Sequence, residues 1–275
     1  MPARVALSRS LVEENRTLER LATLRRINRG SDDPAGLIAA AELESELTAI
    51  EAAERNTARA DAVLAVADSA MGQVGELLNT VESSALAAAG DTATDAEKAA
   101  YQQQIDAALE AIDRIGATTS FGGRNLLDGS ASTLSFVVSA DPADAVSISL
   151  PQVDTGSLGG DAGVLRDLAS GGTASVAAGQ PAAAIDIVRQ ARSALQKSRA
   201  SVGAFQALTV ESSRAVLSES AVQLTSALSS IRDTDVAAET SRLVRSQLLS
   251  SAAFFSVRTS GLQSRRLAAM LIGDE

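Results

Sequence analysis

The chain has 275 residues, a formal net charge of −10, and no Cys, His or Trp. Without Cys and His it lacks a thiolate nucleophile and the usual zinc ligands, so we expect no enzyme, no catalytic residue, no metal and no cofactor. The acidic balance argues against nucleic-acid binding, no apolar run approaches the roughly 20 residues that span a bilayer, and no signal peptide is recognisable, which favours a cytoplasmic protein unless export needs no such signal.

The N-terminal segment predicts one helix that ends near Ile27. Its leucines recur at the spacing of one helical stripe, at Leu7, Leu11, Leu18, Leu21 and Leu24. The polar run "RGSDDP" then interrupts the pattern. Asp33 suits an N-cap and Pro34 suits the first helical position, so this run predicts the end of one helix and the start of another.

A very long helix is predicted from Pro34 to Ala89, about 80 Å at 1.5 Å per residue. Its apolar positions repeat every seven residues in two rows, as in a coiled coil. The first row is Leu43, Ile50, Thr57, Leu64, Met71, Leu78 and Ala85, and the second is Ala53, Ala60, Ala67, Val74 and Val81. Such a narrow seam is not stable alone in water, so the helix needs a partner helix.

The centre of the chain predicts a shorter helix and a hairpin. "TDAE" at 94–97 has capping-box spacing, and the helix it begins runs to about Gly116. Residues 133–138 and 146–150 largely alternate polar with apolar side chains, which predicts a β-hairpin. The composition of residues 151–180, rich in Gly, Ser, Ala and Asp, predicts a surface excursion.

Helical sequence returns at Pro181 and continues to the polar break "RDTD" at 232–235, after which a last helix runs to about Leu271. The seven-residue step of the first part changes face part-way, as a stutter would cause. The predicted fold class is mainly α: a long antiparallel, coiled-coil-like helical bundle formed by both chain ends, with a small β-hairpin region in the middle.

Three stretches resemble the bacterial flagellins. "RINRGSDDPAGLIAAAEL" at 26–43 resembles their N-terminal signature, and "GGRNLLDGS" at 122–130 resembles the turn that precedes their hairpin. "ALSSIRDTDVAAETSRLVRSQLLSSAA" at 227–253 resembles their C-terminal signature. The three motifs occur in the right order at the right spacings, and together they cover both arms of such a protein.

The resemblance implies a self-assembling structural subunit of the extracellular flagellar filament, exported unfolded through the flagellar secretion channel. Residues 1–33 and 234–275 would be terminal helices of the inner filament core, residues 34–150 and 181–233 a helical rod with the hairpin, and 151–180 a short variable surface excursion. The implied partners are further copies of the chain and related flagellins, hook-associated junction and cap proteins, and an export chaperone at the C-terminal helix; no membrane insertion is implied.

The residues expected to carry the signatures and the packing between subunits come from both arms. They are Arg26, Ile27, Asn28, Asp32, Asp33, Pro34, Gly36, Arg232, Asp233, Asp235, Leu243, Gln247, Leu248, Phe254, Leu267 and Leu271. Asp32 and Asp33 could form a carboxylate pair, but adjacent residues rarely aim at one point, so we favour capping. We expect the arginines of the last helices to face acids such as Glu42, Glu44, Glu51 and Glu54.

Two readings of the apolar seams remain open. An intramolecular bundle could bury them all, or part of the terminal helices could stay uncovered and pack only between subunits. The second reading predicts a filament subunit, with two alternatives: a hook–filament junction protein with the same helical plan, or a coiled-coil adaptor that never polymerises. Each buried large side chain is worth roughly 1.5–3 kcal/mol, so a few left bare would drive association.

Overall fold

The computed structural model describes the backbone of residues 2–130 and 133–272, and side chains for 5–130 and 133–259. The chain divides into two compact units, which are described separately. One comprises Met1–Thr48 with Ala221–Glu275, and the other Ala49–Ser220. Two long helices, α2 (Pro34–Ala88) and α5 (Glu211–Arg232), contribute to both units. No helix in the described part of the chain is long and apolar enough to cross a bilayer.

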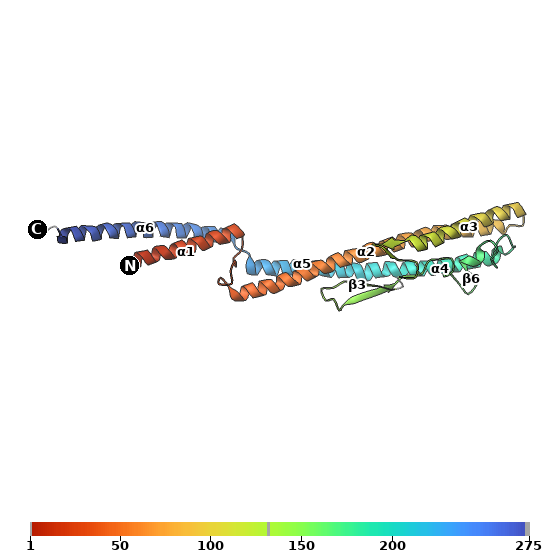
Figure 1. The fold of residues 1–275 in the computed structure, drawn as a ribbon, viewed down its shortest axis with the longest axis horizontal. Helices are drawn as coiled ribbons and strands as arrows, with labels where there is room; N and C mark the ends of the chain where they lie inside the picture. The colour runs from red at the N-terminus through yellow and green to blue at the C-terminus, as the bar shows by residue number, and fades with distance from the viewer. Residues whose placement is uncertain (1, 131–132, 273–275) are drawn as a thin grey trace. The chain divides into compact units, whose positions relative to one another are not determined.

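The 49–220 unit is built on three helices, with α3 (Asp95–Thr118) and α4 (Pro181–Phe205) beside α2 (Figure 1). Both predicted rows of α2 are buried from Ile50 onward. Leu64, Met71 and Leu78 on α2 are completely covered, as is Ile112 on α3. The predicted coiled-coil seam of α2 is therefore confirmed, and its partners are helices of the same chain.

The start of α3 follows the predicted capping box. Thr94 Oγ1 accepts from Glu97 N at 3.3 Å, and Thr94 N donates to Glu97 Oε2 at 2.8 Å. The end of α3 requires a glycine, since a Cβ on Gly116 would lie 1.9 Å from the carbonyl oxygen of Val153. The chain after the hairpin can therefore pass directly over the last turn of α3.

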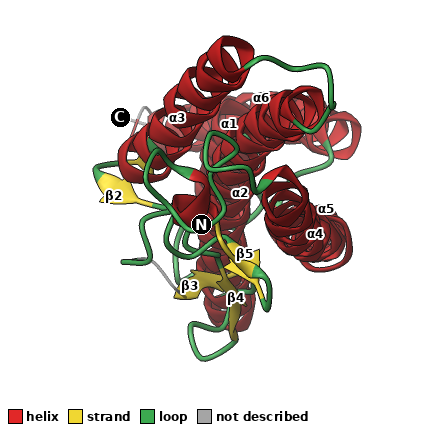
Figure 2. Ribbon diagram, turned by 90° about the vertical axis from the view of Figure 1, so that its right-hand side faces the viewer, coloured by secondary structure: helices red, strands yellow, loops and turns green. Residues whose placement is uncertain are grey.

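The predicted hairpin is confirmed. Strands β3 (Thr133–Val137) and β4 (Ala145–Ser149) pair antiparallel with Leu134 opposite Ile148, and both of these side chains are buried. The pair lies alongside the helices of its unit rather than among them (Figure 2). Two shorter antiparallel pairs are β1 (Ser120–Phe121) with β2 (Arg124–Asn125), and β5 (Gly159–Gly160) with β6 (Gly163–Val164).

Residues 151–180, expected as a surface excursion, contribute to the core. The segment contains β5, β6 and the 3₁₀ helix η1 (Leu165–Leu168). Its buried apolar side chains are Val153, Leu158, Leu165, Leu168, Ala174 and Val176. The buried amide of Gln102 holds the segment: Nε2 donates to Leu168 O at 2.8 Å, and Oε1 accepts from Val176 N at 3.0 Å. The composition of the segment did not predict this burial, because glycine and alanine are common in surface loops but also suit close packing against helices.

The predicted shift of face in the last long helical run has a structural cause. A π-helical turn, η2 (Gln206–Val210), separates α4 from α5 without interrupting the run. The buried positions step by eight from Val202 to Val210 and then by seven to Leu217. A π turn accommodates one extra residue, so it moves the buried seam onto the next position and keeps it facing the same partner.

The other unit pairs helix α1 (Pro2–Thr23) with α6 (Val236–Ile272) (Figure 1). The prediction that the first helix ends near Ile27 is wrong by about one turn. Leu24 has a φ of 57°, which ends the helix, and Arg25 forms an isolated antiparallel bridge with Asp233. Pairing with the second polar break therefore takes these residues away from the helix.

Candidate functional site

The two polar breaks, more than 200 residues apart in sequence, meet in one junction. The backbone N–H of Arg26 donates to the carbonyl oxygen of Arg232 at 2.6 Å, and that of Thr234 donates to Leu24 O at 3.1 Å. Together with the bridge between Arg25 and Asp233, these bonds form a short antiparallel ladder. The ladder fixes where α1 ends and where α6 begins.

The Arg26 side chain ties the junction to two helix ends. Its Nη2 and Nε atoms donate to Ile231 O at 2.5 and 3.2 Å, which covers a carbonyl in the last turn of α5. A guanidinium is favourable there because the last carbonyls of a helix lack intrahelical partners and carry partial negative charge. Its Nη1 atom also lies 3.8 Å from Asp33 Oδ2, at the start of α2.

Asp32 organises the turn between the helices. Its Oδ2 atom accepts the backbone N–H groups of Asn28 at 3.2 Å and Arg29 at 3.0 Å. The hydrogen bond from the Asn28 backbone, aided by that from Arg29, lowers the pKa of the Asp32 carboxyl below its ordinary value. The predicted capping role is therefore wrong for Asp32: its carboxylate holds the turn, because both N–H donors precede it in sequence and neither belongs to α2.

Asp33 caps α2 as predicted. Its Oδ1 atom accepts from Gly36 N at 2.9 Å, and Pro34 opens the helix. Gly36 is needed because a Cβ there would lie 2.5 Å from Asp33 Oδ2 and 2.7 Å from Ile27 Cδ1. Ile27 is buried at 4% exposure, so cap, glycine and isoleucine pack as one cluster.

The second break is held in a similar way. Asp235 Oδ1 accepts from the backbone N–H groups of Ala237 at 2.9 Å and Ala238 at 3.0 Å, which caps α6. Arg232 Nη1 pairs with Glu44 Oε1 on α2 at 2.5 Å, and Arg232 Nε lies 3.8 Å from Asp233 Oδ1. Of the arginines expected to face the acids of α2, Arg232 is confirmed, whereas Arg242 pairs with Glu239 in its own helix.

The seam between α1 and α6 is mainly polar or small. Buried or half-buried positions on α6 repeat every seven residues in two rows: Glu239, Ser246 and Ala253, and Leu243, Ser250 and Val257. Ser10 Oγ of α1 donates to Ser246 O across the seam at 2.9 Å. The predicted leucine stripe of α1 is divided, since Leu7 and Leu21 are half-buried whereas Leu11 and Leu18 are exposed.

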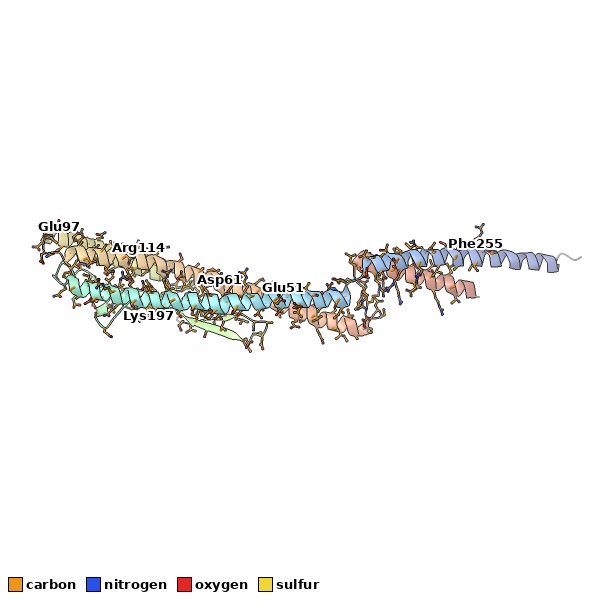
Figure 3. All side chains as sticks on the ribbon, turned by 180° about the vertical axis from the view of Figure 1, so that it is seen from behind. Glu51, Asp61, Glu97, Arg114, Lys197 and Phe255 are labelled. Carbon is orange, nitrogen blue, oxygen red and sulfur yellow. The ribbon has the colours of Figure 1, made fainter. Side chains whose placement is uncertain are left out.

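The large apolar side chains of α6 lie mostly outside this seam. Leu248 is 67% exposed, Phe254 62% and Phe255 71%, and Val244 is also exposed. Figure 3 shows Phe255 projecting from the side of α6 away from α1. A group of large apolar side chains left exposed on one helix often marks a surface that binds a partner. We call this the apolar face of α6, comprising Val244, Leu248, Phe254 and Phe255.

The structure brings ten of the expected site residues into the junction. They are Arg26, Ile27, Asn28, Asp32, Asp33, Pro34, Gly36, Arg232, Asp233 and Asp235. On α6, Leu243 is half-buried towards α1, Gln247 is exposed, and Leu248 and Phe254 belong to the apolar face. Leu267 and Leu271 lie outside the residues whose side chains are described.

Sequence reasoning missed two contributors. Arg25 pairs in the ladder through its backbone, so the pattern of side chains in the sequence could not predict its role. Glu239 is 2% exposed and contacts Arg20 of α1, with Arg20 Nη1 3.4 Å from Glu239 Oε1. The signal for Glu239 was its seven-residue spacing from Ser246 and Ala253, a row without a large apolar residue.

Two family models match the chain. The bacterial flagellin N-terminal helical region matches residues 2–132, and the bacterial flagellin C-terminal helical region matches residues 185–265. The two matches include both halves of the junction and the apolar face of α6.

Several flagellins are similar in sequence. B-type flagellin of Pseudomonas aeruginosa is 35% identical over 153 residues, covering 56% of this chain and 31% of that protein. Polar flagellin F of Vibrio parahaemolyticus is 33% identical over 144 residues, covering 52% and 38%. The matched part thus spans less than half the length of these relatives. A flagellin of Halalkalibacterium halodurans is 26% identical over 243 residues, covering 88% of this chain and 86% of that protein.

One solved structure shows a similar fold over most of the chain. It is described as a putative flagellar hook-associated protein from Vibrio parahaemolyticus, with a TM-score of 0.63 and 15% identity. It covers 74% of this chain and 100% of that chain. At this identity the likeness supports the helical architecture only.

Proposed function

The chain belongs to the bacterial flagellin family, and we propose that it is a structural subunit that assembles with copies of itself into the flagellar filament. Flagellins are structural proteins rather than enzymes. The observation that carries the proposal is the apolar face of α6, left uncovered because α6 turns its small and polar positions towards α1. Burial of this face between subunits is the driving force of assembly.

Exposed leucines on α1 extend the argument to the N-terminal arm. Leu11 is 47% exposed and Leu18 44%. Both arms of the chain thus present apolar side chains that their mutual pairing leaves uncovered. In a head-to-tail contact that does not close on itself, such faces produce an open filament.

The same proposal assigns each part of the chain a place in the filament. Residues 1–33 and 234–275 would form the inner core of the filament, and residues 34–150 with 181–233 would form the surrounding rod. Residues 151–180 would complete the rod, because they supply buried side chains to its core. Further copies, related flagellins, and hook-associated junction and cap proteins are the partners proposed for the assembled state.

Export is part of the proposal. An unfolded chain would pass through the flagellar secretion channel to the extracellular filament, and a chaperone would cover the C-terminal helix beforehand. The exposed fractions of Leu248, Phe254 and Phe255 support this, because bare apolar faces aggregate.

Two alternatives make different predictions for assembly. A hook–filament junction protein would bind filament ends without growing into long tubes, and a coiled-coil adaptor would not polymerise. The flagellin matches at both ends of the chain favour the filament subunit. Electron microscopy of the purified chain at high concentration separates the three.

Deletion of residues 236–275 tests the mechanism. We expect the full chain to be monomeric when dilute and to polymerise on seeds or under salting-out conditions, which strengthen apolar burial. The deletion variant should form no filaments while circular dichroism reports that its rod helices persist. Unchanged polymerisation of that variant would overturn the terminal-helix mechanism.

Point variants refine the test. The triple change Leu248→Gln, Phe254→Gln and Phe255→Gln removes three exposed apolar side chains, each worth about 1.5–3 kcal/mol when buried, and should raise the critical concentration at least about 100-fold. A matched control places three glutamines at exposed positions outside the apolar face, as Ala238→Gln, Arg245→Gln and Ser256→Gln. The control should polymerise almost normally.

A further inference from the structure

A buried carboxylate lies in the contact between α1 and α6, near the last turn of α1 and the first turn of α6. Glu239 is 2% exposed, and its Oε1 and Oε2 atoms face Arg20 Nη1 of α1 at 3.4 Å and Arg242 Nη1 of α6 at 2.9 Å. Burying an ionised carboxylate is unfavourable unless cations and hydrogen bonds compensate it. The α1 surface supplies one of these cations, and any other surface packed there would need to do the same.

The other residues of this seam do little to favour α1 over the surface of another copy of the chain. Its other α6 positions are small or apolar, such as Ser246, Ala253 and Leu243. Small residues fit against many helical surfaces. Without the carboxylate, this side of α6 would pack acceptably on exposed leucines or on the apolar face of another copy.

We propose that Glu239 keeps the two sides of α6 distinct during assembly. Against α1 the carboxylate meets Arg20, whereas against an apolar surface of a second copy it would be buried without the α1 cation. Glu239 therefore excludes the α1-facing side from contacts between subunits and leaves the apolar face as the side that sister copies cover. Glu239 would thus give specificity by making the contact with a second copy unfavourable, and not by strengthening the contact with α1.

The inference rests on the proposed function, since it assigns which side of α6 meets another subunit. The inference also predicts that Glu239 affects which surface α6 packs against more than it affects the stability of the α1–α6 pair. Replacing a buried ion pair by apolar residues is often neutral or stabilising for folding, so Glu239→Leu with Arg20→Met should keep the α1–α6 pair while relaxing its selectivity.

The test uses the absence of cysteine from the chain. A single Ser246→Cys variant places one thiol on the α1-facing side of α6, and a short thiol-to-thiol cross-linker then reports when two such sides meet. Full-length chains would be compared under assembly conditions with Glu239, with Glu239→Gln, and with Glu239→Leu plus Arg20→Met. We expect little cross-linked dimer with Glu239, and at least about fivefold more in both altered backgrounds.

A second pair of thiols checks that the helices still pair. Ser10→Cys with Ser246→Cys should cross-link within one chain in every background, since Ser10 Oγ contacts Ser246 O. Equal dimer yields from Ser246→Cys in all backgrounds, with this internal cross-link intact, would overturn the role of Glu239. Loss of the internal cross-link in both altered backgrounds would overturn it as well, because Glu239 would then be needed for pairing itself.

The outcome is distinguishable from failure of the proposed function. If the unaltered chain forms no filaments under any condition, the filament proposal fails, whereas the cross-linking comparison can still be made on the concentrated chain. If filaments form equally well and the Ser246→Cys yield does not respond to Glu239, only the inference about Glu239 fails.

Discussion

Arg26 and Arg232 are joined by a backbone hydrogen bond of 2.6 Å, so the two polar breaks of the chain form one structural element. Each break ends one helix and caps the next. Because the ladder joins the two breaks, the conformation of each break depends on that of the other. The Arg26 side chain reinforces this by donating to Ile231 O at the end of α5. The junction thereby determines where α1 ends and where α6 begins.

Removing the Arg26 side chain should loosen the junction without unfolding the rod. Arg26→Ala loses the hydrogen bonds to Ile231 O and the contact with Asp33, whereas the backbone ladder remains. We expect trypsin to cleave at Arg25 and Arg29 several-fold faster in this variant. Arg55→Ala is the control, because Arg55 makes an exposed contact with Glu51 at 3.9 Å, away from the junction. Equal cleavage in the two variants would contradict the role assigned to Arg26.

Gly36→Ala should destabilise the chain even though alanine favours helices. The added Cβ would lie within 2.7 Å of Ile27 Cδ1 and closer still to Asp33, so the cap and the buried isoleucine must both shift. We expect a loss of about 1–3 kcal/mol, as for overpacking elsewhere, measured by denaturant unfolding.

Gly203→Ala is the matched control for Gly36→Ala. Gly203 also lies in a helix, and a Cβ there would meet nothing within 4 Å. It should raise stability by up to about 1 kcal/mol, the usual advantage of alanine over glycine in a helix. A stabilising effect at both positions would show that the Asp33–Gly36–Ile27 cluster adapts freely.

Acid should open the turn between α1 and α2. The folded-state pKa of Asp32 is lowered from 3.8 by the backbone hydrogen bonds from Asn28 and Arg29. A lowered pKa contributes stability that is present above the unfolded-state value and is lost as pH falls through the folded-state value. The backbone amide chemical shifts of Asn28 and Arg29 should therefore change below pH 3.8.

Asp32→Asn is the control for this titration. The amide oxygen can still accept from the backbone but does not ionise in this range. The same acid-induced change in the Asn variant would assign the titration to another carboxyl group.

Periodicity predicted most of the helical architecture. The seven-residue rows of α2 placed Leu64, Met71 and Leu78 in the core, and the changed step in the C-terminal half anticipated the π turn at 206–210. Local chemistry predicted the caps, because Asp33 and Thr94 each accept from an N–H group three residues away. Helical periodicity and caps can be predicted from sequence because they depend on residues close together in the chain.

Features that depend on distant partners escaped prediction. The helix end at Thr23 reflects pairing of Arg25 with Asp233, and the burial of residues 151–180 depends on the Gln102 amide. The division of the α1 leucines between α6 and solvent also needs the position of the second helix. Pattern alone could not decide which apolar side chains the chain covers itself.

The central claim, that sister copies cover the apolar face of α6, can be measured with one thiol. Ser251 is exposed, three residues after Leu248 and four before Phe255, so Ser251→Cys places a probe on that face while keeping both side chains. We predict rapid labelling by a thiol reagent in the dilute monomer and at least about tenfold slower labelling in the filament. Equally rapid labelling in both states would contradict the account.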